Sequence, residues 1–258
     1  MITKAGVPSA AWARKYSGCP GPVALRLLCF PHAGGGASLF RNWRLPDDLP
    51  AEVWAVQLPG RENRRAEEPF RRIEPLLAAL IDALRPLMDR PVAFFGHSMG
   101  ALIAFEFSRE LRRTGRPLPV RLFLSARRSP ELAPRHPQAS RLPDPEFFAR
   151  LDRVAGGSAA AGRDPELIRL LAPLIRTDFG LCEHYRHRDE PPLPIPFTCF
   201  SATEDTEVSP ADVAGWERHS SASWRHCVYP GGHFFIRDHE QSVLADIAAD
   251  LRLGLPDG

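Results

Sequence analysis

The chain has 258 residues, 44% of them hydrophobic, which is enough to bury the core of one substantial domain over residues 1–258. The formal net charge of +2, from 33 basic and 31 acidic residues, is too small and too evenly spread to indicate a nucleic-acid footprint. The five cysteines are odd in number and lack CxxC spacing, so neither a disulfide framework nor a zinc site is expected.

The start of the chain, MITKAGVPSAAWARKYSG, lacks the apolar core of a signal peptide. No later run approaches the ~20 apolar residues of a membrane span. We therefore expect a soluble, cytoplasmic protein that does not contact a membrane.

Buried strands alternate with helices through the first half of the chain, after a polar and frayed beginning. Continuous apolar runs, typical of strands buried on both faces, occupy residues 25–30, 52–58, 91–96 and 120–125. Helices are predicted between these strands, at 37–43, 70–88 and 99–114. This alternation predicts an α/β fold with a mostly parallel central sheet flanked by helices.

The alternation breaks after the fourth of these strands. From about 127 to 194 no buried strand occurs, and helices are predicted at 144–153 and 165–179. An insertion of this length inside a compact domain is usually functional, so we expect a helical lid over 127–194. Alternation then resumes with strands at 196–202 and 224–229 and helices at 210–219 and 240–253. The chain is therefore expected to re-enter the same sheet after the lid.

A candidate nucleophile lies between the strand at 91–96 and the helix at 99–114. The segment Gly96-His97-Ser98-Met99-Gly100 fits G-x-S-x-G, in which glycine on both sides permits a sharp strand-to-helix turn that projects the serine from the sheet. About 0.1 chance matches are expected in a chain of this length. The context between strand and helix therefore favours a nucleophile elbow of the α/β-hydrolase fold, with Ser98 as nucleophile, over a structural Gly-Ser turn.

A serine hydroxyl needs an imidazole to accept its proton, and in this fold the order along the chain is serine, acid, histidine. His233, in Gly231-Gly232-His233-Phe234, follows the last predicted strand, where a base can reach the elbow. A turn histidine is the alternative. His226 and His239 are less suitable because the first lies inside that strand and the second opens the final helix.

The acid is expected in the loop after the strand at 196–202, which contains Glu204, Asp205 and Glu207. Asp205 is favoured because related hydrolases place their acid about this far beyond the strand, and because Ser209 is better placed to cap the next helix. Some hydrolases carry the acid before the lid, where this chain offers only Glu131.

The segment Pro31-His32-Ala33-Gly34-Gly35-Gly36 follows the first predicted strand, where an α/β-hydrolase supplies one oxyanion-hole amide. We predict that the backbone N–H groups of Ala33 and Met99 form the oxyanion hole. A phosphate-binding loop would end in Gly-Lys-Ser/Thr, and a dinucleotide-binding loop would have a third glycine where Leu39 stands. His32 is expected to bond within the loop rather than to act as a second base.

Six segments carry a family resemblance across most of the chain. They are LLCFPHAGGGASLFRNW (27–43), AVQLPGRENRR (55–65), FFGHSMGALIAFE (94–106), LPDPEFFARL (142–151), LIRTDFGLCEHY (174–185) and YPGGHFF (229–235). In this order they resemble the type II thioesterases, the stand-alone editing enzymes of polyketide and nonribosomal peptide synthases. By position, Ser98, Asp205 and His233 match the family triad, and Ala33 and Met99 match its oxyanion donors. Ala202 departs from the glycine expected there.

The resemblance implies a thioester hydrolase that removes aberrant or stalled acyl groups from carrier proteins through an acyl-serine intermediate, with no cofactor or metal. The implied partner is an acyl or peptidyl carrier protein with an acyl-phosphopantetheine arm. No nucleic-acid partner is expected. A chain-releasing thioesterase, a carboxylesterase or proline iminopeptidase, and a non-catalytic binding module remain alternatives.

Two further sets of residues leave alternatives open. Apolar lid side chains recur at helical spacing, and most are expected to pack while a minority lines an acyl chamber; they are Phe147, Phe148, Leu151, Leu167, Leu170, Leu171, Leu174 and Phe179. Seven arginines are expected either to contact an acidic carrier protein or to be solvated surface charges. They are Arg61, Arg64, Arg65, Arg71, Arg72, Arg127 and Arg128.

Overall fold

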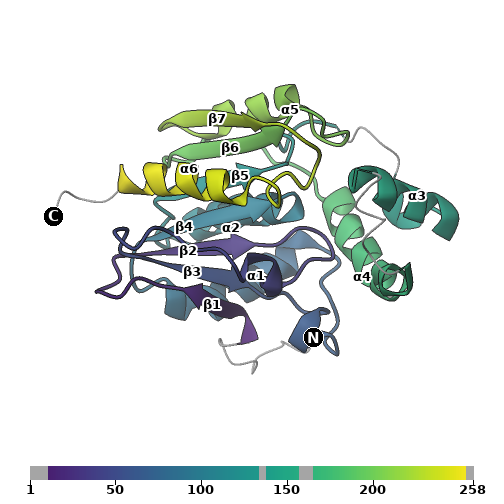
Figure 1. Cartoon of the computed structure of the whole chain (residues 1–258), viewed down its shortest axis with the longest axis horizontal. Helices are drawn as coiled ribbons and strands as arrows, with labels where there is room; N and C mark the ends of the chain where they lie inside the picture. Colours follow the sequence, from purple (N-terminus) through teal and green to yellow (C-terminus); the bar gives the residue numbers. More distant parts are fainter. Residues whose placement is uncertain (1–10, 134–137, 157–164, 254–258) are drawn as a thin grey trace.

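The computed structural model describes residues 11–133, 138–156 and 165–253, and Figure 1 shows a central sheet with helices against it. Within these ranges the sheet has seven strands, which are β1 (Ala13–Ser17), β2 (Leu25–Phe30), β3 (Ala51–Val56), β4 (Val92–His97), β5 (Arg121–Ser125), β6 (Phe197–Ala202) and β7 (Trp224–Tyr229). They lie in the order β1-β3-β2-β4-β5-β6-β7, and every pair is parallel except β1 with β3. The mostly parallel sheet predicted from the sequence is confirmed.

The first strand, β1, was not predicted. Its residues pair antiparallel with β3, from Ala13 opposite Val56 to Ser17 opposite Val53. Trp12 and Ala13 are buried and Tyr16 packs partly against the core, while Arg14 is exposed, so the strand contributes few side chains to the core. The expectation of a frayed beginning is wrong for this segment because a short edge strand needs little apolar sequence when its partner is already buried.

The longer helices outside the insertion are α1 (Ile73–Leu84), α2 (Met99–Arg113) and α6 (Glu240–Arg252). Apolar residues of α1 and α2 pack on one face of the sheet and those of α6 on the other. The helix predicted at 37–43 is a short 3-10 helix at Ala37–Phe40, and the one predicted at 210–219 is α5 (Pro210–Ala214) followed by a 3-10 helix. Within the described ranges, no helix is long and apolar enough to cross a membrane.

The strand order reverses between β2 and β4. The chain leaves β2 to form β3 on one side and returns to form β4 on the other. In an open parallel sheet the crevice at the carboxyl ends of two such strands is the usual place for a ligand. The loop at 31–36 follows β2 and the turn at Ser98 follows β4, so both predicted functional segments meet at this crevice.

Helix α2 packs very closely on the end of β2. A Cβ atom at Gly100 would lie 2.0 Å from the carbonyl oxygen of Phe30, and one at Gly96 would lie 2.2 Å from the carbonyl oxygen of Gly100. Both positions therefore require glycine. Between them Ser98 has a φ of 55°, in the left-handed region that non-glycine residues rarely adopt. The surrounding contacts hold this strained turn in place.

Residues 127–194, called here the helical insertion, separate β5 from β6 and contain α3 (Asp144–Val154) and α4 (Pro165–His184). The two helices lie together at one side of the sheet, on the right in Figure 1. Helix α4 continues beyond the predicted end at residue 179 and contacts the crevice loops. A Cβ atom at Gly34 would meet Ile175 at 2.6 Å, and one at Gly60 would meet Leu174 at 3.2 Å.

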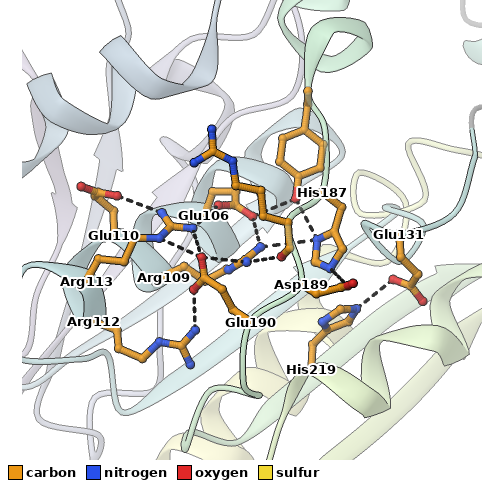
Figure 2. A network of polar contacts seen from close by, with 12 residues as sticks. Glu106, Arg109, Glu110, Arg112, Arg113, Glu131, His187, Asp189, Glu190 and His219 are labelled. Carbon is orange, nitrogen blue, oxygen red and sulfur yellow. Dashed lines mark hydrogen bonds and ion pairs between the residues drawn. The ribbon is translucent and has the colours of Figure 1, made fainter.

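The insertion is anchored where it returns to the sheet. Figure 2 shows Glu190 among three arginines of α2, with N–O distances of 3.0 Å to Arg109, 2.6 Å to Arg112 and 2.5 Å to Arg113. Partial burial raises the pKa of Glu190, but hydrogen bonds from the arginines outweigh it and lower the pKa to about 2. Glu190 therefore remains ionised, and the helix that begins after Ser98 also holds the end of the insertion.

Substitution of Gly100 by alanine tests the close approach of α2 to β2. We expect Gly100→Ala to lower the free energy of unfolding by about 3 kcal/mol or more, because its Cβ would clash with backbone rather than with a movable side chain. Urea denaturation measures the change. The control is Gly21→Ala, whose Cβ meets nothing within 4 Å, and it should stay within about 0.5 kcal/mol of the parent. Equal stabilities for the two variants would contradict this account.

Candidate active site

Three side chains from separate loops form a hydrogen-bonded line at the crevice. Ser98 Oγ lies 3.0 Å from His233 Nε2, and His233 Nδ1 lies 2.8 Å from Asp205 Oδ2. Ser98 follows β4, Asp205 follows β6 and His233 follows β7. With Nδ1–H donating to the carboxylate, Nε2 is left to accept the serine proton. The structure thus brings together all three residues predicted from the sequence.

Asp205 is the one of the three candidate acids that contacts His233. Its side chain is completely buried, and Oδ1 accepts hydrogen bonds from the backbone N–H groups of Glu207 at 2.8 Å and Val208 at 3.2 Å. These bonds leave Oδ2 directed at the imidazole. Glu204 is exposed, and Glu207 instead forms an ion pair with Arg150 of α3.

Ser98 is held by its backbone as well as by its side chain. Its N–H donates to the carbonyl oxygen of Ser125 at 2.8 Å, which ties the elbow to the neighbouring strand β5. Its carbonyl accepts from the N–H of Ala101 at 3.1 Å, at the start of α2. Ser98 is partly exposed and lines a cavity of about 1060 Å³, so the hydroxyl can meet a substrate.

The two predicted oxyanion donors border the same cavity as Ser98. Met99 is the first residue of α2, where backbone N–H groups have no acceptor inside the helix. Ala33 lies in a tight turn in which the carbonyl of His32 accepts from Gly35 N–H at 2.9 Å. The buried His32 ring donates from Nδ1 to the carbonyl of Ala33 at 2.8 Å, a contact within the loop as expected.

The cavity has a volume of about 1060 Å³ and lies between the crevice loops and the helical insertion. Leu151, Leu171, Ile175 and Phe179 line it, whereas Phe147 is fully buried in packing. Leu170 is 75% exposed, so it neither lines the cavity nor packs in the interior, contrary to the expectation for that position. Among the described residues, histidine, cysteine, aspartate and glutamate form no group of three that could hold a metal ion.

Comparison with known proteins decides the family. The Thioesterase domain family matches residues 25–251. The chain belongs to this family. A curated relative, the thioesterase PikA5 of Streptomyces venezuelae, is 37% identical over 97% of this chain and 90% of its own. This thioesterase is therefore a hydrolase that acts on thioesters.

Two solved structures support the same assignment. RedJ, a thioesterase from the prodiginine pathway of Streptomyces coelicolor, has a TM-score of 0.82 and 36% identity over 96% of this thioesterase and 95% of its own chain. BorB, a type II thioesterase from the borrelidin biosynthetic cluster, has a TM-score of 0.79 and 34% identity over 94% and 97%. These matches confirm the predicted α/β-hydrolase fold and the resemblance to type II thioesterases.

The docking hypothesis for the arginines is wrong at two positions of this thioesterase. Arg61 and Arg64 are buried, with only 4% and 2% of their surface exposed. The Arg64 guanidinium lies 4.0 Å from the Trp12 ring and donates to the carbonyl of Gln57 at 2.8 Å. The sequence pattern does not predict the burial of Arg61 and Arg64, because arginine is ordinarily a surface residue.

His97, next to Ser98 in the chain, is a second imidazole whose place in the fold the sequence does not predict. It is completely buried, its ring lies 5.4 Å from the ring of His233, and Nδ1 is 2.9 Å from Ser125 Oγ. Burial lowers the pKa of His97 well below its ordinary value, and the charges of His233 and His32 lower it further. His97 is therefore neutral at pH 7 and places no positive charge beside His233.

The buried His97 predicts a loss of stability in mild acid. Its pKa is lower in the folded than in the unfolded chain, so the unfolded chain binds the extra proton and stability falls as the pH drops below about 6.5. We expect His97→Asn to make the decline in unfolding free energy between pH 7 and 5 shallower, by up to about 1.4 kcal/mol per pH unit. Urea denaturation at several pH values measures the slope.

The control for this slope is His184→Asn, at an exposed histidine of α4. It should retain the parent slope. An unchanged slope in His97→Asn would show that His97 does not contribute to the decline.

Proposed function

We propose that this thioesterase removes aberrant or stalled acyl groups from the phosphopantetheine arm of carrier proteins in a polyketide or nonribosomal peptide synthase. The observation that carries the proposal is the hydrogen-bonded line of Ser98, His233 and Asp205 beside a cavity of about 1060 Å³. The type II thioesterases among its structural relatives supply the substrate class. The proposed partner is an acyl or peptidyl carrier protein.

In the proposed acylation, Ser98 Oγ attacks the thioester carbonyl carbon while His233 Nε2 takes the hydroxyl proton. The developing oxyanion accepts hydrogen bonds from the N–H groups of Ala33 and Met99, each worth about 3 kcal/mol in a preorganised site. Asp205 holds the neutral His233 ring in the tautomer with its proton on Nδ1 and stabilises the imidazolium that forms. The C–S bond then breaks, and the pantetheine thiol leaves with the proton from His233.

In the proposed deacylation, a water molecule attacks the acyl-serine as His233 Nε2 takes a proton from it. A second oxyanion forms against the same two amides. Its collapse releases a carboxylic acid and returns the proton to Ser98 Oγ.

We propose further that residues 1–258 form one catalytic domain in which the helical insertion is a lid over the acyl group. The apolar side chains of Leu151, Leu171 and Phe179 along the cavity support this role, because an acyl chain gains free energy by leaving water against them. The polar reacting centre is at the loop side of the same cavity, where Ser98 and His233 lie.

Replacement of the nucleophile tests the mechanism. We expect Ser98→Ala to lower kcat for an acetyl-pantetheine thioester by about 10⁴-fold or more, because the remaining donors cannot form an acyl-enzyme. Thiol release followed with a disulfide reagent measures the rate. Ser221→Ala, at an exposed serine outside the cavity, is the matched control and should keep the parent rate. Full activity of Ser98→Ala would overturn the proposed role.

The substrate class is tested with one carrier protein loaded in turn with acetyl, propionyl, malonyl and longer acyl groups. We expect kcat/KM for acyl release from the carrier to exceed that for the matching p-nitrophenyl ester or a prolyl anilide by at least about ten-fold, because only the carrier substrate offers the pantetheine arm. A preference for the oxoester would indicate a carboxylesterase, and one for the anilide a proline iminopeptidase. Release of only a full-length product would indicate a chain-releasing enzyme.

A further inference from the structure

Arg61 and Asp178 form a buried ion pair that the proposed mechanism does not use. Arg61 lies in the loop after β3, and Asp178 lies in α4 of the helical insertion. Their side chains are 3% and 2% exposed, and two parallel contacts join them, Nη1 to Oδ2 and Nη2 to Oδ1, each at 2.9 Å. A bidentate pair of this kind fixes the orientation of the carboxylate as well as its position.

The pair reaches the loop at 31–36, called here the oxyanion loop, through two further hydrogen bonds. Asp178 Oδ2 accepts from the backbone N–H of Gly34 at 2.7 Å, and Arg61 Nη1 donates to the carbonyl of Gly35 at 3.0 Å. Ile175, one turn before Asp178 on α4, packs directly on Gly34, where a Cβ would meet it at 2.6 Å. The helical insertion therefore touches the loop with both an apolar side chain and a hydrogen-bond acceptor.

These contacts fix the peptide units on both sides of Ala33. In the unit after it, the Ala33 carbonyl accepts from His32 Nδ1 at 2.8 Å and the Gly34 N–H donates to Asp178. In the unit before it, the His32 carbonyl accepts from Gly35 N–H at 2.9 Å. Because peptide units are planar, holding them in this way sets the direction of the Ala33 N–H.

We propose that Asp178, oriented by Arg61, is a positioning residue that aims the Ala33 N–H at the substrate oxyanion. This inference rests on the proposed function, because it assigns Ala33 as an oxyanion donor. Without the acceptor on α4, the partly buried Gly34 N–H loses its hydrogen-bond partner, so the peptide unit can rotate and turn the Ala33 N–H away from the oxyanion. The insertion thus supplies part of the oxyanion hole's support in addition to covering the cavity.

Two double variants separate the effect of losing the hydrogen-bond acceptor at position 178 from the effect of losing the ion pair with Arg61. Arg61→Met/Asp178→Asn and Arg61→Met/Asp178→Leu both remove the ion pair, so neither leaves an unpaired buried charge, and asparagine and leucine have similar shapes. Only the asparagine variant offers an oxygen to Gly34 N–H. We expect kcat for acetyl-pantetheine to be about 10- to 100-fold lower in the leucine variant than in the asparagine variant, with KM within about three-fold.

A tetrahedral inhibitor gives a second readout that a merely structural role would not move. An alkyl boronic acid forms an adduct on Ser98 whose oxygen occupies the oxyanion hole, so its affinity should fall in the leucine variant by about the same factor as kcat. The control is Asp144→Asn, which removes a different ion pair of α4, the one between its Arg176 and Asp144 of α3, and should leave kcat within about two-fold.

Each outcome separates this inference from the proposed function. Equal kcat and equal boronic acid affinity in the two double variants would overturn the positioning role while leaving the thioesterase assignment intact. A parent enzyme that fails to hydrolyse thioesters would overturn the proposed function, and the inhibitor affinities would still test the aim of the Ala33 amide. If a double variant fails to fold, Asp178→Asn is compared with Asp178→Leu; both leave Arg61 without its charged partner, so a lower kcat in the leucine variant still reports the missing acceptor, and equal kcat would overturn the positioning role.

Discussion

The contact between Gly100 of α2 and the end of β2 sets the geometry on which the rest of the site depends. A Cβ at Gly100 would strike the carbonyls of both Phe30 and Pro31, at 2.0 and 2.8 Å. Those two residues lead into the oxyanion loop, while α2 begins with Met99 immediately after the strained Ser98. The absence of a side chain at Gly100 therefore fixes how far Ser98 lies from the loop that carries Ala33. Ser98 and both proposed oxyanion donors are positioned by a single close approach of a helix to a strand.

The titratable and charged side chains near this contact are buried, and burial affects each of them differently. Asp205 lies fully buried with one oxygen held by backbone amides, which leaves the other for His233. His97 is an imidazole in the same buried region, but burial keeps it neutral, so the positive charge that develops during the proposed reaction belongs to His233 alone. Arg61 and Asp178 neutralise each other beside the oxyanion loop. Electrostatic preorganisation of this kind acts through fixed groups in a site with little water.

The sequence predicted most of the elements because apolar runs and helical periodicity report burial directly. β2 was located to the residue, since six consecutive apolar or buried positions end abruptly at proline. β1 was missed because an edge strand with Arg14 and Lys15 facing solvent carries no such run. The line of Ser98, Asp205 and His233 followed from loop positions and chain order. The burial of Arg61 and its pairing with Asp178 could not be predicted, because that pairing depends on how α4 lies across a loop distant from it in sequence.

The separation of these partners along the chain has a consequence for synthesis on the ribosome. Ser98 and His233 are 135 residues apart, and Gly34 and Asp178 are 144 apart. A nascent chain that has folded its first strands and α2 thus presents the serine with neither base nor acid, because the loops after β6 and β7 have yet to emerge. Under the proposed mechanism such a chain holds an unactivated hydroxyl. The chain can then hydrolyse thioesters only after β7 and the loop that follows it have folded. Incomplete chains therefore cannot remove acyl groups from a working synthase.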